Sequence, residues 1–126
     1  MGTWGSDNFD SDTALDYLAE VCDPLVDKLL KVVENPSLAE ADEDGGVEAL
    51  VAAELLLLVS ARYYNPRLTP RLIAECGAIV LSQWEATIDA LGPKPDYKVE
   101  RRQVIHQTFE HLLAAVQHWP PPIDEA

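Results

Sequence analysis

The chain has 126 residues and a mass of 13.9 kDa, enough for one hydrophobic core and too little for two ordinary domains. Apolar residues make up 48% and charged residues 25%, a mixture typical of globular rather than disordered chains. Its 22 acidic residues outnumber its 9 lysines and arginines, for a net charge of −13. This balance predicts no nucleic-acid binding, because neutralising phosphates requires a basic surface.

The negative charge is concentrated in the first half of the chain. Residues 1–54 carry 14 acids and two lysines, whereas residues 55–126 carry 8 acids and 7 bases. Such asymmetry has two interpretations: an acidic surface that binds a basic partner protein, or a well-solvated surface that only keeps the protein soluble.

Targeting signals are not apparent. The N-terminus lacks the basic and apolar regions of a secretory signal, and the longest apolar stretch, residues 47–61, is too short for a membrane span and contains Glu48 and Glu54. Cys22 and Cys76 lie in apolar helical patterns, typical of buried, reduced thiols. We therefore expect a cytoplasmic protein that does not associate with membranes.

The first half of the chain predicts a lead-in and one or two helices. Residues 1–11 are rich in glycine and aspartate, and Asp10 or Ser11 is placed to cap the helix that follows. Leucines then recur at three- and four-residue spacing, interrupted by Asp23-Pro24. We expect helices over 12–22 and 24–34, or one kinked helix. Residues 35–46 should form a loop.

Three more helices are expected in the second half, over about 47–63, 70–90 and 96–118, each bounded by proline or glycine. The prolines at 120–122 end the last one, and residues 120–126 are predicted to be a mobile tail. No strand-like alternation competes with these patterns. The sequence thus predicts an all-α, single-domain bundle of about four to five helices.

The predicted helix over 47–63 is the most hydrophobic element and has no fully polar face, which places it at the centre of the bundle. Glu54 lies within its apolar residues and has no cation three or four positions away. A buried carboxylate needs a partner, so we expect one from another helix: Tyr17, His106 or an arginine between positions 62 and 71.

The N-terminal residues carry a family resemblance. Positions 1–6 read Met-Gly-Thr-Trp-Gly-Ser, positions 8–14 Asn-Phe-Asp-Ser-Asp-Thr-Ala, positions 16–18 Asp-Tyr-Leu, and positions 48–54 Glu-Ala-Leu-Val-Ala-Ala-Glu. This pattern resembles the mostly bacterial family catalogued as domain of unknown function 4259. The resemblance implies a cytoplasmic, all-helical domain in a bacterium, and it implies no activity.

Two acidic clusters are the candidate interaction surface. The first is Trp4, Asp7, Asp10 and Asp12 in the lead-in, where an exposed tryptophan flanked by carboxylates could anchor a partner. In the alternative interpretation, Trp4 and Phe9 cover one end of the bundle and Asp10 or Ser11 caps the helix. The second cluster is Glu40, Asp42, Glu43 and Asp44 in the loop.

Catalytic and metal sites find little support. His106 and Glu110 are four residues apart, which is ordinary spacing for neighbours on a helix surface. No nucleophile elbow, phosphate-binding loop or dinucleotide fingerprint is present. A basic and aromatic cluster between Arg62 and Arg71 is expected to pair with nearby acids rather than bind an anion. The sequence therefore predicts no catalytic residue, metal or cofactor.

These observations favour a protein-interaction module that binds a basic partner, as immunity or inhibitor proteins do. Two alternatives stay open. One is a structural homo-oligomer, which the leucine-rich helix would permit. The other is a small hydrolase or metal-dependent enzyme built on Glu54 and a histidine.

Overall fold

The computed structural model describes residues 2–120, and it is all α-helical over that range apart from turns and one isolated β-bridge. The α-helices are α1 (Asp12–Glu34), α2 (Gly45–Val59), α3 (Pro70–Thr87) and α4 (Pro95–Val116). Two short 3₁₀-helices, η1 (Pro36–Ala39) and η2 (Ile88–Leu91), follow α1 and α3 respectively. The predicted all-α bundle is confirmed, with four α-helices. The tail predicted to be mobile lies, beyond residue 120, outside the described residues.

Helix α1 is one continuous element. It begins where the Ser11 hydroxyl accepts a hydrogen bond from the Ala14 backbone N–H at 3.1 Å, which makes Ser11 the cap. It then runs through Pro24, whose ring removes one backbone donor. Cys22 and Val26 on either side are both buried, so tertiary packing outweighs this local cost. Of the two sequence alternatives, the single helix is correct.

The helices are separated at the prolines and glycines where the sequence predicts breaks. Thr69 caps α3 by accepting from the Leu72 N–H at 3.0 Å, with Pro70 as the first helical residue. Gly92 has φ +66°, a left-handed conformation that suits glycine, and it reverses the chain between η2 and α4. Helix α2 ends at Val59, four residues earlier than expected, because the following turn carries Tyr63 into the core.

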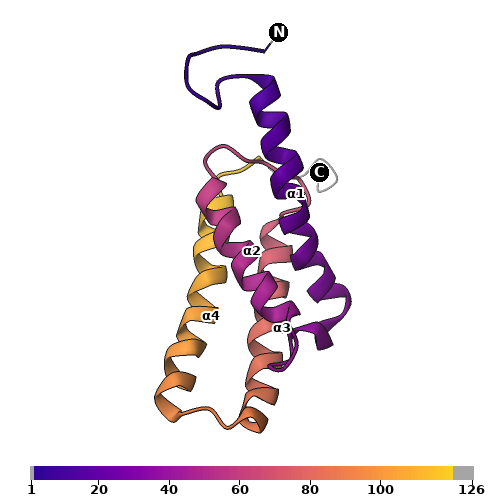
Figure 1. The fold of residues 1–126 in the computed structure, drawn as a ribbon, viewed down its shortest axis with the longest axis vertical. Coiled ribbons are helices and arrows are strands. Elements are labelled where there is room, and N and C mark those ends of the chain that lie inside the picture. The colour runs from indigo at the N-terminus through magenta and orange to yellow at the C-terminus, as the bar shows by residue number, and fades with distance from the viewer. Residues whose placement is uncertain (1, 121–126) are drawn as a thin grey trace.

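The four helices form a ring in which α1 packs on α2 and α3, and α4 packs on the same two (Figure 1). Helices α2 and α3 therefore lie diagonally across the bundle. The centre is filled by fully buried aliphatic side chains from all four helices, the largest being Leu29, Leu56, Ile73, Ile105 and Leu112. Trp119 closes the end beyond α4, where its indole N–H donates to the Ser60 carbonyl at 3.3 Å.

Helix α2 is a corner of this ring, not its centre. Its core side carries Ala49, Ala53 and Leu56, which are all buried, whereas Leu58 is 74% exposed. The prediction of a central helix was wrong because a helix that is apolar all round gives no periodic signal of which side faces the core. One apolar side of α2 is left facing solvent.

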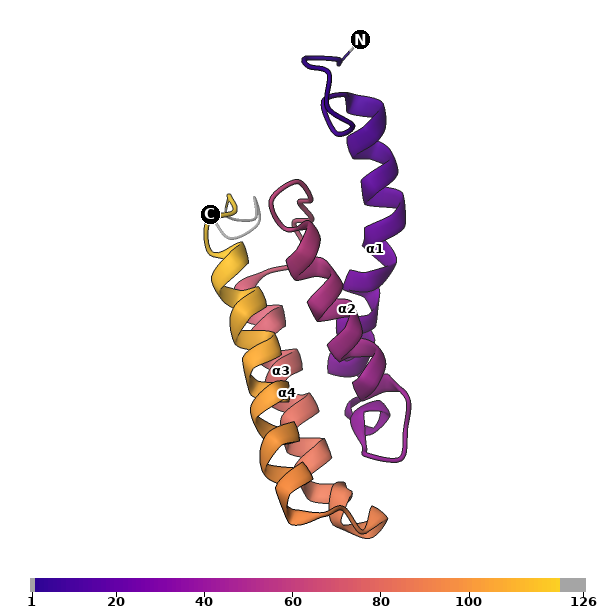
Figure 2. The same ribbon diagram turned by 60° about the vertical axis from the view of Figure 1, so that its left-hand side comes forward.

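The N-terminal turns of α1 project beyond the other three helices (Figure 2). Residues 2–11 fold back on that projecting end as a small hook. The loop between α1 and α2 lies at the opposite end of α1 (Figure 1). Helix α1 therefore separates the two acidic clusters predicted from the sequence.

Candidate interaction surfaces

The hook, residues 2–11, is a backbone-bonded loop. The Trp4 N–H donates to the Asp10 carbonyl at 3.0 Å, and the Asp12 N–H donates to the Gly2 carbonyl at 2.6 Å. Within it, the Asp10 carboxylate accepts from the Asp7 N–H at 3.1 Å. A Cβ atom at Gly2 would overlap the Asp12 carboxylate, so a side chain there would require the exposed Asp12 side chain to move. The Asp10 carboxylate is thus held by a defined local structure.

The hook presents aromatic rings to solvent. Trp4 is 57% exposed, so it does not cover the end of the bundle as the alternative interpretation had it. Phe9 is more covered, because the Arg62 guanidinium lies 5.3 Å from its ring centroid. The hook is therefore an exposed tryptophan beside three aspartates, tethered to the α2–α3 turn through one cation–π contact.

The second acidic cluster, Glu40 to Asp44, lies at the far end of α1. Asp42, Glu43 and Asp44 are exposed, and Glu40 is half-buried. Since α1 has 23 residues, its ends are separated by about 33 Å at about 1.5 Å per residue. The structure therefore does not bring the hook and this loop into a single patch.

A row of acids on α1 connects the two clusters. Asp16, Glu20, Asp23, Asp27 and Glu34 fall within about 60° of one another around the helix axis, at 100° per residue. Two of them are engaged: Arg67 pairs with Asp27 at 3.0 Å, and Asp23 binds groups after α2. We call the hook, this row and the 40–44 loop together the acidic α1 side.

Glu54 is exposed, so its predicted burial was wrong. It lies at the edge of a shallow groove between α2 and α4 that is also lined by Leu57, Val104, Gln107, Thr108 and His111. Of the apolar residues on its side of α2, Val47, Val51 and Leu58 face solvent, whereas Leu50 is buried. Glu54 and His111 do share this groove, the arrangement the enzyme alternative needs, yet both are exposed and lie in open solvent.

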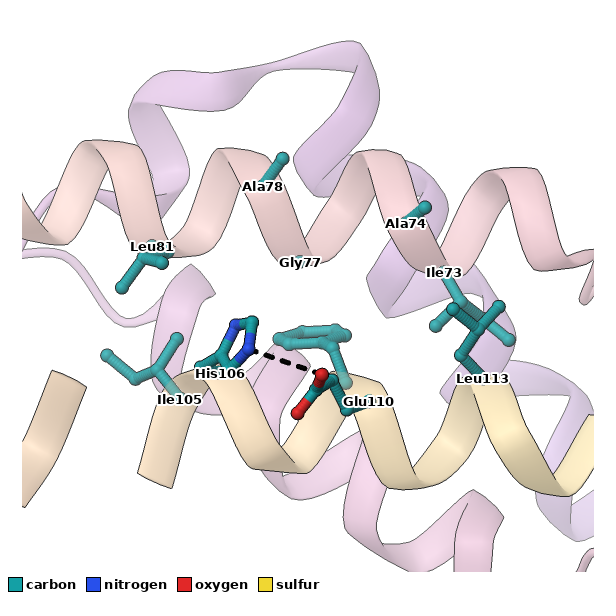
Figure 3. Close-up of a pocket in the computed structure, with 10 residues that line it drawn as sticks. Ile73, Ala74, Gly77, Ala78, Leu81, Ile105, His106, Glu110 and Leu113 are labelled. Carbon is teal, nitrogen blue, oxygen red and sulfur yellow. Dashed lines mark ion pairs between the residues drawn. The ribbon is translucent and has the colours of Figure 1, made fainter. Parts of the chain in front are cut away.

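A groove of about 300 Å³ between α3 and α4 is the main apolar hollow on the described surface (Figure 3). Its walls are Ile73, Leu81 and Leu113 with small residues of α3 between them. The polar groups at its rim are His106 and Glu110, which form an ion pair at 3.3 Å and are both more than half exposed. Two arginines of the cluster from 62 to 71 pair with acids as expected, in Arg67–Asp27 and Arg71–Glu75, whereas Arg62 lies on the Phe9 ring instead.

Sequence reasoning missed one buried polar network. The Asp23 carboxylate accepts from the Tyr63 hydroxyl at 2.5 Å and from the Asn65 amide at 3.0 Å, and that amide also donates to the Tyr63 oxygen at 3.0 Å. Asn65 is the buried polar residue of the core. Burial, and then the hydrogen bond to Asp23, raise the pKa of Tyr63 well above its ordinary value. The network fastens the α2–α3 turn to α1.

The Tyr63 phenol gives this network a pH signature. The pKa of Tyr63 is raised in the folded state, so folding favours the neutral phenol. This contribution to stability is fully present below the ordinary pKa of tyrosine, about 10, and is lost as the pH rises above that value. Tyr63→Phe should lower the free energy of unfolding by about 1 kcal/mol at pH 7. The difference from wild type should shrink between pH 10 and pH 12 in urea unfolding. Tyr97→Phe, at an exposed tyrosine, is the matched control; parallel pH profiles of wild type and Tyr63→Phe would contradict the assignment.

The structure also bears on the cysteines, on metal binding and on membrane spans. Cys22 and Cys76 are free and buried, and burial raises the pKa of Cys76 to about 12. Within residues 2–120, no three His, Cys, Asp or Glu side chains are grouped so that they could hold a metal ion. None of the helices in that range is long and apolar enough to cross a membrane.

Comparison with known proteins gives the family and no close relative. The model of the family described as domain of unknown function (DUF4259) matches residues 2–119, nearly the whole chain. The chain therefore belongs to this family. No curated protein and no solved structure matches it.

Proposed function

We propose that this chain is a cytoplasmic, bacterial protein-interaction module whose acidic α1 side binds a basic partner protein, in the manner of an immunity or inhibitor protein. The observation that carries the proposal is the concentration of acids on that side. Thirteen of the 14 acids in residues 1–54 belong to residues 7–48, which comprise most of the hook, α1, the 40–44 loop and the start of α2. Only Lys28 and Lys31 offset them within this span.

The shape of the acidic α1 side favours an extended basic surface as its counterpart. Its two ends are about 33 Å apart, so a partner must present positive charge over a comparable length to contact both. Trp4 at one end is suited to an arginine side chain, because its exposed ring can take a guanidinium on its face while Asp7 and Asp12 pair with other cations.

Charge of one sign on one side of a protein accelerates encounter with an oppositely charged surface. Exposed charges are screened beyond about 8 Å at physiological salt and about 30 Å at 0.01 M. The association rate with a basic partner should therefore fall as salt is added, whatever the detailed contacts.

The experiment compares charge reversals at the two ends of the acidic α1 side. The tagged chain is used to isolate binding proteins from cells of its host at low salt, and the association rate of each purified protein is measured by surface plasmon resonance. Asp7→Lys/Asp12→Lys alters the hook, and Asp42→Lys/Glu43→Lys alters the loop. Each pair should slow association about tenfold or more at low salt, since steering changes such rates by about 10- to 1000-fold.

The matched control is Asp96→Lys/Glu100→Lys, which makes the same change in net charge at exposed positions of α4. It should slow association much less than either pair on the acidic α1 side. If all three double variants slow association equally, only net charge matters and the acidic α1 side is not the binding surface. If association is indifferent to salt and to all the reversals, the acidity serves solubility alone.

A further inference from the structure

The solvent-facing side of α2 is an apolar stripe with no covering element among the described residues. Val47, Val51, Leu55 and Leu58 are 56%, 53%, 42% and 74% exposed, and they follow one another at spacings of four, four and three residues. This is the spacing of a helix–helix seam, in which apolar side chains of one helix pack between those of another. Four exposed aliphatic residues in a row on one helix mark an interaction site.

The stripe ends in opposite charges. Asp44 lies three residues before Val47 at the N-terminal end of α2; it is exposed, and its side chain does not cap the helix. Arg62 follows four residues after Leu58, in the turn beyond the end of α2. It is exposed, its guanidinium lies over the Phe9 ring, and it forms no ion pair within residues 2–120. The full row is therefore Asp44, Val47, Val51, Leu55, Leu58, Arg62.

This row is complementary to itself when reversed. Laid antiparallel on a second copy, Val51 meets Leu55, Val47 meets Leu58, and Asp44 meets Arg62, each twice by symmetry. We propose that the chain forms a two-fold homodimer in which the α2 helices of two copies pack antiparallel along this stripe. The antiparallel arrangement also sets the two helix dipoles favourably, whereas a parallel one would place Asp44 against Asp44 and Arg62 against Arg62.

Neighbouring helices widen the surface. The ion pair between Lys28 and Glu48, at 2.7 Å, fixes the register of α1 against α2. Val21 lies seven residues before Lys28 on α1, and Leu55 lies seven residues after Glu48 on α2. Val21, which is 53% exposed, is therefore level with Leu55 on the same side of the bundle. Val104 of α4, 45% exposed, lies in the groove on the other flank. A second copy would thus cover residues of three helices.

A second copy fits the stripe better than a uniformly basic helix. Such a helix could pair with Asp44 before the start of α2 but would meet Arg62 in the turn after its end. The remaining charge of two copies, −13 each, repels at long range. Dimerisation should therefore strengthen as salt rises from 0.01 to 0.15 M, because screening removes that repulsion while the apolar seam persists. Binding of a basic partner should respond to salt in the opposite sense.

The first experiment measures the mass of the full chain by sedimentation equilibrium from 1 μM to 1 mM at 0.15 M salt. Wild type should show a monomer–dimer equilibrium. Leu58→Lys should weaken dimerisation at least about tenfold, because it buries a charge in the seam, and it should leave the thermal midpoint of the monomer unchanged since the side chain is exposed. Val99→Lys, at a similarly exposed apolar residue of α4, should dimerise like wild type.

The second experiment tests the antiparallel pairing by exchanging its end charges. Asp44→Arg and Arg62→Asp should each weaken self-association about tenfold, because two attractive pairs become two repulsive ones. Mixing the two variants should restore association, since the mixed pair again matches opposite charges at both ends. The double variant should also dimerise, because it carries the exchanged pair in each copy.

A wild-type chain that stays monomeric up to 1 mM would overturn the proposal. A dimer insensitive to Leu58→Lys would overturn it as well, because its interface would lie elsewhere. Loss of association in both charge variants without recovery on mixing would refute the antiparallel pairing. Each outcome is independent of whether a basic partner binds the acidic α1 side.

Discussion

Leu56→Ala should lower the free energy of unfolding by about 2–5 kcal/mol, whereas Leu58→Ala, two residues later on the same helix, should change it by less than about 0.5 kcal/mol. Leu56 is fully buried in the core and leaves a cavity when truncated. Leu58 is 74% exposed, so its side chain loses little packing in the monomer. The pair is matched in residue type, helix and chemical change.

Urea unfolding monitored by circular dichroism distinguishes the two variants, at protein concentrations low enough to keep the chain monomeric. Equal losses of stability would mean that α2 is enclosed on all sides, as the sequence predicted. A larger loss at Leu58 than at Leu56 would reverse the orientation of the helix. Either result would also remove the basis for an α2 seam between copies.

The helices themselves were predictable because local signals agree with the fold. Ser11 caps α1, Thr69-Pro70 opens α3, and Gly92 ends the turn before α4, as their sequence contexts indicate. The three- and four-residue spacing on α1 includes Leu18, Cys22 and Leu29, which are buried, but it did not indicate the buried Val26 and Val32. The error of four residues at the end of α2 came from Tyr63, whose hydroxyl and ring are held by contacts distant in sequence.

The placement of α2 was not predictable from its own residues. Its apolar side chains are distributed all round the axis, so no helical-wheel argument separates Leu56, which is buried, from Leu58, which is not. Glu54 was misplaced for the same reason. The side that faces the core is decided by where α1 and α4 pack, and that is a property of the whole bundle.

The acidic clusters show what charge patterning can and cannot predict. Composition and loop signals correctly indicated that Asp42, Glu43 and Asp44 are exposed. They could not indicate that α1 continues through Pro24 as one helix of 23 residues, which places this loop about 33 Å from the hook. Nor could they reveal the bond between Asp23 and Tyr63, which are 40 positions apart.

The two proposed surfaces occupy different parts of the molecule and share Asp44. A dimer built on α2 would engage Asp44 but leave the hook, including Trp4 and Asp7, outside the seam. The hook variants leave the apolar stripe of α2 unchanged, and Leu58→Lys leaves the acids of the acidic α1 side unchanged. Added salt should weaken binding of the basic partner and strengthen dimerisation, so the salt dependence distinguishes the two interactions a second time.

A close contact between α3 and α4 predicts the second large effect. Gly77 of α3 lies against Phe109 of α4, and a Cβ atom at this position would be 2.9 Å from both Cβ and Cγ of Phe109. Phe109 is buried and cannot swing away freely. Gly77→Val should therefore push the two helices apart and lower the free energy of unfolding by about 3 kcal/mol, the upper end of the usual cost of overpacking.

Ala78→Val is the matched control, because it introduces the same β-branched residue at the next position of α3, where the side chain is exposed. It should lower the free energy of unfolding by no more than about 0.7 kcal/mol, the difference in helix propensity. The loss caused by Gly77→Val should be smaller in a Phe109→Ala background than in wild type, since alanine removes Cγ and the ring and leaves room for the valine. Equal effects of valine at positions 77 and 78, or an equal loss with and without Phe109→Ala, would show that α3 and α4 do not meet at this glycine.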